Sequence, residues 1–466
     1  MKWFKILLIL LLIPSLSWGA TYYMRADGTD ADSDCSGSSA CCAGSMDVSD
    51  HNADNPGLAA GDTVVRCANG GDITARIIPP VTGTSGNPIT YTTNGDVVHD
   101  GSGAFDSFRG AANIDYITID GGEIKDGNSH GLDTNSGDNW IVQNVTAHDN
   151  TGYGLRASGG SIDVLFVDSV AYNNTVAGIG CSTCTGLIIR RCTSYDNTTV
   201  ANADGFFIGT ATNPTIEYSV AYGNTNGASA DGLQIQDSPN ATVRYNYIYD
   251  NGNSEVLFGG TGTYATVYGN VIKSDTASQD AIHLDLQTGN TVIYNNIIYN
   301  GQFDINTIAD PQTLTVTNNI FHGNTGVAVN EAVGVDNALI TMDYNLIYNT
   351  SGTMISWEGN NYTQAQFASY QSTESQDSNS STSDPKFIAP SNNLFIPKAE
   401  SPAKGKGTDL GSTYENMLSP NAMWPGSVQL LKQRSNWDIG AYKSLAGPMP
   451  TVTPVPFPIP IPLLEP

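Results

Sequence analysis

Residues 202–237 read NADGFFIGTATNPTIEYSVAYGNTNGASADGLQIQD and hold two near-copies of one unit. Each copy begins with an Ala-Asp-Gly turn followed by a short strand of alternating residues, so that Asp204 and Asp231 occupy the same place in successive copies. If each copy is one coil of a stacked solenoid, neighbouring strands lie about 4.8 Å apart. Two carboxylates held that close need a cation, a shared proton or water. The pair is therefore the first candidate for chemistry.

The same unit recurs along most of the chain. Its polar corners, such as AYNN and IYDN, begin at residues 147, 171, 194, 221, 248, 272, 298, 321 and 347, so successive corners are 23 to 27 residues apart. Apolar and polar residues alternate within the units, as in residues 114–119 and 242–249, which is the pattern of strands. The repeat predicts an all-β fold, a parallel β-solenoid of roughly ten or more coils.

Aligning the corners produces columns with a physical meaning. One column, placed just before the corner, predicts an asparagine ladder in which each amide donates to the next coil: Asn246, Asn270, Asn296, Asn319 and Asn345. A second column runs along the corners and predicts a ridge of stacked rings: Tyr172, Tyr195, Tyr222, Tyr249, Tyr299 and Tyr348, with His148, Lys273 and His322 interleaved.

Repeat length, ladder and the N-x-I-Y-x-N corner together resemble the right-handed parallel β-helix proteins, the pectate-lyase-like superfamily, over residues 101–385. We expect residues 21–100 to cover and start the stack, because a solenoid must protect its first coil. Residues 386–446 resemble the C-terminal segment of many bacterial β-helix proteins (D-P-x-F … D-I-G-A-Y) and are expected to cap the last coil. The proline-rich residues 447–466 cannot join a sheet, and we interpret them as a spacer, a docking segment or a disordered end.

The chain begins MKWFKILLILLLIPSLSWGA, which has the charged start, apolar run and small residues of a secretory signal peptide over residues 1–20, with cleavage near Gly19 or Ala20. The apolar run is too short to span a membrane. We therefore expect a secreted protein, extracellular or periplasmic. Disulfides are then the default for its seven cysteines, an odd number, so at least one thiol is left over or pairs between chains. Their positions are 35, 41, 42, 67, 181, 184 and 192.

The net charge of −26 argues against nucleic acid, which is bound through Lys and Arg. It also disfavours a polyanionic sugar polymer unless calcium bridges the two. The expected partner is a polysaccharide or a surface glycan.

One face of the solenoid carries the candidate site residues. If Phe206 and Leu233 point inward, one outward column holds Asp133, Arg156, Gly180, Phe207, Gln234, Leu257, His283 and Asp304, and the next holds Ser158, Ser182, Gly209, Gln236, Gly259, Asp285 and Asn306. The turn before each strand contributes His130, Asp204, Asp231 and Asp280. We predict catalytic roles for His283, Asp280, Asp204 and Asp231, and substrate binding by Arg156, Gln234, Gln236, Asp285 and Asp304.

Each candidate also has a structural interpretation. Asp before Gly is a common turn residue, because its side chain accepts from nearby backbone amides. His283 lies between acids that would raise its pKa, yet a solvated surface histidine is also consistent with the pattern. Cys181 and Cys184 form a CxxC that suits a structural disulfide better than a metal or redox site.

The turn Asn202-Ala-Asp-Gly-Phe and, one coil later, Ala230-Asp-Gly-Leu-Gln resemble the family-nine pectate lyases. That resemblance implies that Asp204 and Asp231 are calcium ligands. Ala230 and Gln234 stand where two further carboxylates are expected, and Leu257 stands where the family has its catalytic lysine. His283, one coil further on, is a possible substitute base.

Two classes of function follow. The first is an enzyme that acts on a polysaccharide, either a lyase with calcium at Asp204 and Asp231 or a hydrolase with a pair of Asp residues. The second is a non-catalytic protein: a glycan-binding surface protein or adhesin, or a structural fibre. The fold does not decide between them, since this fold supports several activities.

Overall fold

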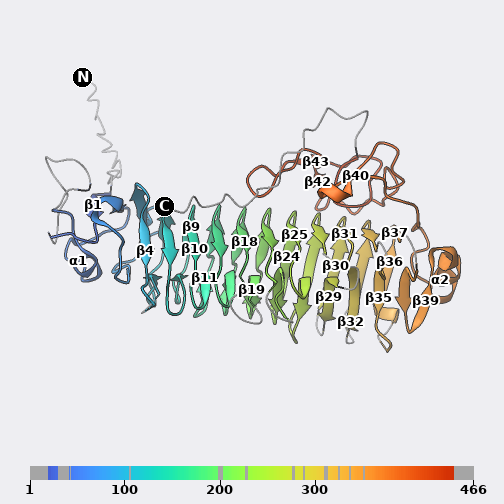
Figure 1. The fold of residues 1–466 in the computed structure, drawn as a ribbon, viewed down its shortest axis with the longest axis horizontal. Coiled ribbons are helices and arrows are strands. Elements are labelled where there is room, and N and C mark those ends of the chain that lie inside the picture. The colour runs from blue at the N-terminus through green and yellow to red at the C-terminus, as the bar shows by residue number, and fades with distance from the viewer. Residues whose placement is uncertain are drawn as a thin grey trace, which may run out of the picture.

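The computed structural model describes residues 19–29, 41, 44–103, 106–197, 203–225, 229–274, 279–286, 289–308, 313–323, 326–334, 337–349 and 352–444. The expected leader over residues 1–18, the tail from residue 445 onward, Cys35 and Cys42 lie outside the described residues. The protein is an elongated parallel β-solenoid with a C-terminal segment packed along one side (Figure 1).

Three long parallel sheets form the solenoid, and each coil adds one strand to each sheet. Within the described residues, sheet A has 13 strands: β1 (Thr21–Met24), β2 (Thr63–Cys67), β3 (Ile89–Asn94), β6 (Ile117–Asp120), β9 (Ile141–Gln143), β13 (Leu165–Val167), β17 (Ile188–Arg190), β21 (Thr215–Glu217), β24 (Ala241–Arg244), β27 (Ala265–Tyr268), β30 (Asn290–Tyr294), β33 (Thr313–Thr317) and β36 (Ile340–Asp343).

Sheet B follows sheet A around the coil. Over the same described ranges it has 11 strands: β4 (Val98–Asp100), β7 (Glu123–Lys125), β10 (Thr146–His148), β14 (Val170–Tyr172), β18 (Thr193–Tyr195), β22 (Val220–Tyr222), β25 (Tyr247–Tyr249), β28 (Val271–Lys273), β31 (Ile297–Tyr299), β34 (Ile320–His322) and β37 (Leu346–Tyr348).

Sheet C completes the coil and carries the predicted site. Its 12 strands in the described part of the chain are β5 (Phe108–Arg109), β8 (Leu132–Asp133), β11 (Tyr153–Ala157), β15 (Ala177–Cys181), β19 (Asp204–Gly209), β23 (Leu233–Gln236), β26 (Ser254–Gly259), β29 (Asp280–Leu286), β32 (Gln302–Ile308), β35 (Val329–Glu331), β38 (Ile355–Trp357) and β39 (Asn360–Tyr362). β39 pairs antiparallel to β38 and ends the sheet. A short sheet of β12 (Ser161–Ile162), β16 (Cys184–Thr185) and β20 (Ala211–Thr212) lies beside it.

The core fills the inside of the coils. Phe206, Leu233, Val256, Ile282 and Phe303 are fully buried in successive strands of sheet C, as the sequence columns predict. Because side chains of a strand point alternately to its two faces, the residues between these positions face outward. The predicted all-β solenoid is confirmed.

The predicted asparagine ladder is also present. Each Nδ2 donates to the Oδ1 of the asparagine in the next coil, from Asn246 through Asn270, Asn296 and Asn319 to Asn345, at 2.9 to 3.3 Å. Asn345 then donates to Oδ1 of Asp377 at 3.0 Å, and that contact ends the ladder.

The structure contains a second ladder that the sequence analysis did not predict. It runs through the last residue of the corners, Asn150, Asn174, Asn197, Asn224 and Asn251, with Nδ2 to Oδ1 distances of 2.8 to 3.2 Å. Asn251 donates to the buried carboxylate of Glu255, which closes this ladder. The first half of the solenoid is thus bonded at one corner and the second half at another.

Helix α1 (Val48–Asn52) packs at the N-terminal end, where Val48 is buried in the main core. At the other end α2 (Phe367–Glu374) covers the last coil, because Tyr370 packs against Trp357 and Tyr362 while Phe367 stacks on Tyr370. The end is therefore covered by residues that precede the expected C-terminal capping segment.

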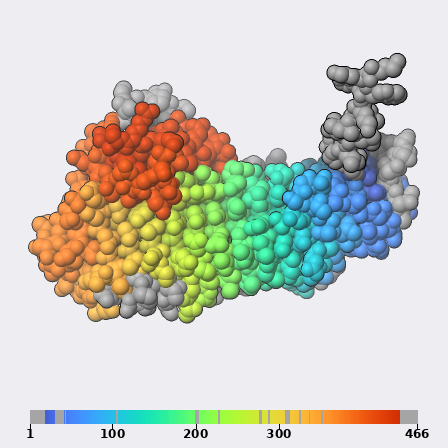
Figure 2. Space-filling model, turned by 180° about the vertical axis from the view of Figure 1, so that it is seen from behind, coloured from blue at the N-terminus to red at the C-terminus, as the bar shows by residue number. Residues whose placement is uncertain are grey.

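The residues after 386 instead fold back along the side of sheet B (Figures 1 and 2). They contain two antiparallel pairs, β40 (Phe387–Ala389) with β41 (Leu394–Pro397), and β42 (Asn416–Leu418) with β43 (Leu430–Lys432). Trp424 packs on Tyr247, and Phe395 packs on Tyr299. We call residues 387–444 the side cap, because they cover a flank of the solenoid and not its end.

The described cysteines form two disulfides, Cys41–Cys67 and Cys181–Cys184, and Cys192 is a buried free thiol. The CxxC is thus a local structural link, as expected. None of the described helices has the length and apolar character that a membrane crossing requires.

Candidate functional site

The strand register of sheet C places the predicted outward residues in one row. Successive Cα pairs join Asp133 to Arg156, Gly180, Phe207, Gln234, Leu257, His283 and finally Asp304. We call this the outward row of sheet C. The first and last residues are seven strand steps apart, about 34 Å at the sheet spacing. A row of that length suits an extended polymer better than a small molecule.

The second outward column departs from the sequence prediction at one place. Gly209 pairs with Gln236 and Gln236 with Gly259, but Asp285 pairs with Thr307 and not with Asn306. The register shifts between Leu284 and Asp285, which leaves Asn306 as the extra residue of a bulge. An insertion of one residue cannot be detected from the repeat period, because that period varies anyway.

Asp204 and Asp231 lie in adjacent coils, as predicted, but both are almost completely buried. Oδ1 of Asp204 accepts the backbone N–H of Asp231 at 2.8 Å. Oδ1 of Asp231 in turn accepts the N–H of Ser254 at 2.8 Å and Nδ2 of Asn253 at 3.0 Å. Each carboxylate therefore connects its own coil to the next.

Burial sets the protonation of this pair. It raises the pKa of Asp231 to about 6, although the amide of Ser254 and the charge of His283 act in the opposite direction. Burial, followed by the neighbouring Asp231, raises the pKa of Asp204 well above its ordinary value. Both acids therefore favour the protonated form in mildly acidic solution.

Calcium does not fit this pair well. Calcium takes six to eight oxygen ligands, whereas Asp204 and Asp231 each use one oxygen on a backbone N–H and are 2% and 1% exposed. Ala230 offers no side-chain ligand. We derive no step through calcium at these residues.

A second group of residues converges two coils beyond Asp231. Nδ1 of His283 lies 2.9 Å from Oδ2 of Asp280 and 3.0 Å from Oδ2 of Asp304. Oδ1 of Asp304 accepts Nδ2 of Asn330 at 2.5 Å. Asp280 and His283 are partly exposed, whereas Asp304 is more buried. We call Asp280, His283 and Asp304 the acid–imidazole group.

The acid–imidazole group can hold a proton or a metal ion. Hydrogen bonds that the ring donates to Asp280 and Asp304 raise the pKa of His283 to about 10, so that the ring is an imidazolium at neutral pH. In that form it donates protons and is not the free base that the sequence analysis considered. One ligand atom from each residue also lies within 4.8 Å of the others, a separation that suits a single divalent ion.

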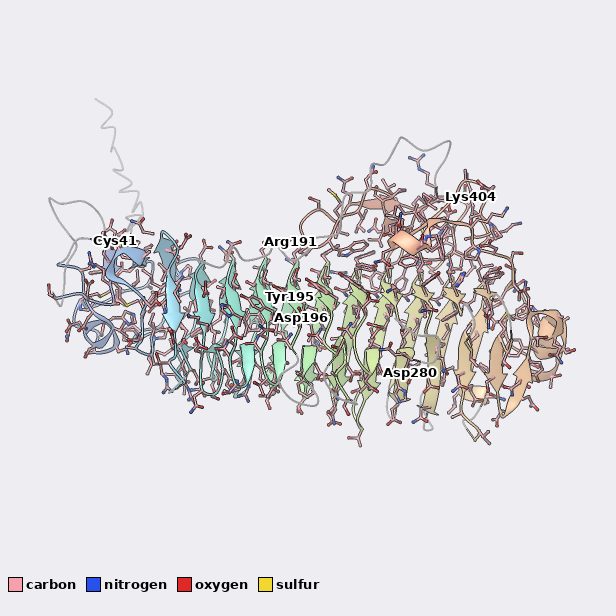
Figure 3. All side chains as sticks on the ribbon, viewed as in Figure 1. Cys41, Arg191, Tyr195, Asp196, Asp280 and Lys404 are labelled. Atoms are coloured by element: carbon pink, nitrogen blue, oxygen red, sulfur yellow. A yellow bond between two sulfur atoms is a disulfide. The ribbon has the colours of Figure 1, made fainter. Side chains whose placement is uncertain are left out.

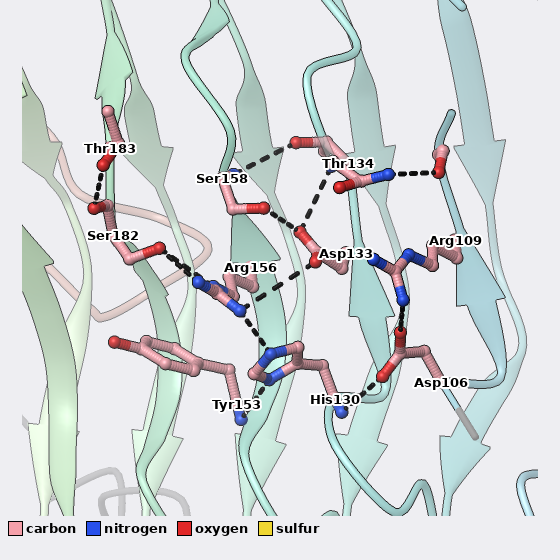
Figure 4. A network of polar contacts seen from close by, with 12 residues as sticks. Asp106, Arg109, His130, Asp133, Thr134, Tyr153, Arg156, Ser158, Ser182 and Thr183 are labelled. Atoms are coloured by element: carbon pink, nitrogen blue, oxygen red, sulfur yellow. Dashed lines mark hydrogen bonds and ion pairs between the residues drawn. The ribbon is translucent and has the colours of Figure 1, made fainter. Parts of the chain in front are cut away.

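Arg156 lies at the other end of the outward row, within a network of polar side chains (Figure 4). Its Nη2 and Nε donate to Oγ of Ser182 at 2.5 and 3.1 Å, and its Nη1 contacts Nε2 of His130. The nearest oxygen of Asp133 is 3.9 Å away. The guanidinium is about a quarter exposed and lies over the ring of Tyr153 at 5.5 Å.

The partners of Arg156 are themselves fixed. Oδ1 of Asp133 accepts Oγ of Ser158 at 2.5 Å. Oδ1 of Asp106 accepts the backbone N–H of His130 at 2.9 Å, and its Oδ2 bonds Arg109 at 3.2 Å. Burial, then the charge of Arg156, lowers the pKa of His130. The ring is thus neutral at physiological pH.

Asp106, His130 and Asp133 belong to the site but were not among the residues predicted for it. Asp133 and His130 stand in the same sequence columns as His283 and Asp280, so the signal was present. Asp106 precedes the first clear corner and has no such signal. Of the remaining predicted residues, Gln234 and Gln236 bond each other at 3.4 Å, and Asp285 is partly exposed on β29.

Comparison with known proteins identifies the class. The family described as right handed beta helix region matches residues 84–230 and 204–368, more than half of the chain. The chain therefore belongs to the right-handed β-helix family. No curated protein matches it.

Several solved structures share the fold at low sequence identity. The crystal structure of pectate lyase Pel9A has 16% identity and a TM-score of 0.50, covering 91% of this chain and 96% of that one. The A-module of the mannuronan C-5 epimerase AlgE6 of Azotobacter vinelandii has 17% identity and a TM-score of 0.45, covering 72% and 94%. PfbA, a surface adhesin of Streptococcus pneumoniae, has 13% identity and a TM-score of 0.36, covering 64% and 80%. The likeness to pectate lyase Pel9A shows the fold alone.

Proposed function

We propose that the protein is exported and binds a polysaccharide along the outward row of sheet C, where the acid–imidazole group cleaves it. The main support for this proposal is that His283 lies between two carboxylates on a partly exposed sheet face. Arg156 and Gln234 lie on the same row and offer donors for sugar oxygens. The leader sequence supports export.

The acid–imidazole group contains the parts that cleavage of a glycosidic bond requires. An imidazolium donates a proton to the leaving oxygen, and an ionised carboxylate activates water or attacks the sugar. Nδ1 of His283 lies within hydrogen-bond distance of a carboxylate oxygen of Asp280 and of Asp304, so the proton donor and both carboxylates lie together. Leu257 stands where the pectate lyases have their lysine base, so we favour hydrolysis over β-elimination as the reaction.

The test is turnover on a panel of neutral and acidic polysaccharides. We expect new reducing ends without the absorbance of an unsaturated uronate, and loss of that activity in His283→Ala and Asp304→Asn. Asn290→Ala, at the exposed start of β30 in sheet A, is the matched control and should keep full activity. Unsaturated product would instead show a lyase. Binding without turnover across the panel would reject cleavage and leave a glycan-binding protein of the adhesin type.

The pectate-lyase resemblance implies bound calcium, so the proposal also concerns which metal ion binds and where. A site of one imidazole and two carboxylates suits zinc or manganese better than calcium, which prefers oxygen alone. Calorimetry with calcium, manganese and zinc distinguishes binding at the acid–imidazole group from binding at the buried pair of Asp204 and Asp231. Uptake abolished by His283→Ala places the ion in the acid–imidazole group. Uptake abolished by Asp231→Asn but retained in His283→Ala places it at the buried pair.

A further inference from the structure

One surface of sheet B is built from rings and plays no part in the proposed function. His148, Tyr172, Tyr195 and Tyr222 lie at matching positions of β10, β14, β18 and β22. Their ring centroids are 4.6 to 5.1 Å apart, and neighbouring planes differ by 16° or less. We call these four residues the ring stripe. Figure 3 labels Tyr195 and its neighbour Asp196 on coils that lie closer to the N-terminal end of the solenoid than the side cap does.

The same column is covered further along the solenoid. Tyr299 packs against Phe387 and Phe395 of the side cap, and His322 packs against Phe387. Within the described residues, the rings of Tyr172 and Tyr195 contact other rings only inside the column. Both side chains are partly exposed. Among the described residues, the side cap therefore covers the later part of this column and leaves the earlier part free for another segment to bind.

The described chain ends next to the ring stripe. The backbone N–H of Lys443 donates to Leu418 O, and Tyr442 packs against Trp424. Trp424 contacts Tyr247, whose ring stacks on Tyr249 at 4.6 Å, and Tyr249 stacks on Tyr222 at 5.2 Å. The last described residues, up to Ser444, thus lie on the flank that bears the stripe.

We propose that residues 445–466, the tail, bind along the ring stripe of their own molecule as a polyproline helix. The tail has Pro at every second position from Pro454 to Pro462, and its one ionisable side chain is Glu465. A polyproline helix rises about 3.1 Å per residue, so 22 residues reach about 68 Å. The path from Tyr249 to His148 is four strand steps, about 19 Å.

The chemistry of the two surfaces matches. The carbonyl groups of a polyproline helix have no internal partners, and tyrosine hydroxyls at the ring edges can donate to them. Prolines and the apolar residues between them bury ring edges, as in other aromatic surfaces that bind proline-rich segments. A sugar ring needs an open aromatic face, and stacking hides the faces here. Asp149 and Asp196, beside the stripe, do not oppose an almost uncharged segment.

The test is photo-cross-linking in the full chain with p-benzoylphenylalanine in place of Phe457. We expect cross-linked peptides to contain residues of β10, β14 or β18. A mixture of isotope-labelled and unlabelled chains identifies which molecule supplies each peptide, and we expect both parts to come from one molecule. Cross-links between two chains, cross-links to other surfaces, or none would each overturn the proposal.

Two variants examine the rings directly. Tyr172→Ser with Tyr195→Ser should abolish the cross-link, whereas Gln234→Ser with Gln236→Ser on sheet C should leave it unchanged. Tyr195→Phe keeps the stack and removes one hydroxyl, so the cross-link yield should fall by up to about fivefold, the worth of one hydrogen bond. Circular dichroism shows whether each variant is folded. An unchanged yield in a folded double-serine variant would exclude the stripe as the docking surface.

Discussion

Asp231 gives one carboxylate oxygen to the amide of Ser254, while its Oδ2 is buried without a hydrogen-bond partner among the described residues. The sequence predicted the position of this residue from the Ala-Asp-Gly repeat. It could not predict the burial, because an Asp-Gly turn on a solvated edge and one packed between coils have the same sequence. Burial changes what the residue does, since a neutral acid stabilises the folded state where an ionised one would not.

Replacing Asp231 by Asn should change how stability depends on pH. A folded pKa of about 6 lies above the unfolded value of 3.8, so the folded state binds more protons between these values. The wild type should therefore lose up to about 3 kcal/mol of unfolding free energy as pH rises through that window. Asp231→Asn should show a smaller loss. Urea titrations at several pH values measure this, and equal slopes for the two proteins would contradict it.

His283 should show a dependence in the same direction, in a higher pH range. Its folded pKa of about 10 lies above the ordinary 6.5, so the protonated ring stabilises the fold fully below pH 6.5, and the contribution disappears as pH rises through about 10. His283→Gln should therefore be less stable than the wild type at neutral pH and nearly equal to it above pH 10. Thermal unfolding of both proteins across this range is the measurement. A constant difference would mean that the ion pairs with Asp280 and Asp304 do not form.

At the scale of the structural element, the repeat decides most of the architecture. The predicted columns that contain Asn246 and Phe206 form a ladder and a core in the structure, because both columns follow the same repeat period. The second ladder was missed because Asn at a corner is also an ordinary turn residue. The bulge at Asn306 was missed because it depends on packing between coils and not on the period.

Asn270→Ala should destabilise the solenoid strongly. Asn270 accepts from Nδ2 and the backbone N–H of Asn246, and donates to Asn296 and to the carbonyl of Val243. Alanine leaves these buried groups unpaired, at a cost of about 3 kcal/mol. Asn290→Ala, whose side chain is exposed on β30, should cost less than about 0.5 kcal/mol. Chemical denaturation compares the two, and similar midpoints would argue that water replaces the lost bonds.

At the scale of the whole molecule, the side cap was the least predictable part. Its contacts join residues far apart in the sequence, such as the hydroxyl of Tyr245 with the carbonyl of Asn416 and the indole N–H of Trp424 with the carbonyl of Tyr245. No repeat period reports contacts of that kind. Helix α2, which covers the last coil, was not predicted either.

Trp424→Ala should loosen the side cap without unfolding the solenoid. The change removes the ring that packs on Tyr247 and the hydrogen bond to Tyr245. We expect a protease to cleave within residues 387–444 at least tenfold faster, a change of about 1.4 kcal/mol in local opening. The circular dichroism of the strands should be retained. Simultaneous loss of both signals would mean that the cap and the solenoid unfold as one unit.

The two asparagine ladders meet in a single coil, where Asn246 belongs to one and Asn251 to the other. The turn that contains them has an asparagine of each ladder, whereas the turns before and after it have an asparagine of only one ladder. The solenoid should therefore resist separation of neighbouring coils more strongly at this coil than near its ends. We expect fragments divided at this coil to recombine more tightly than fragments divided elsewhere.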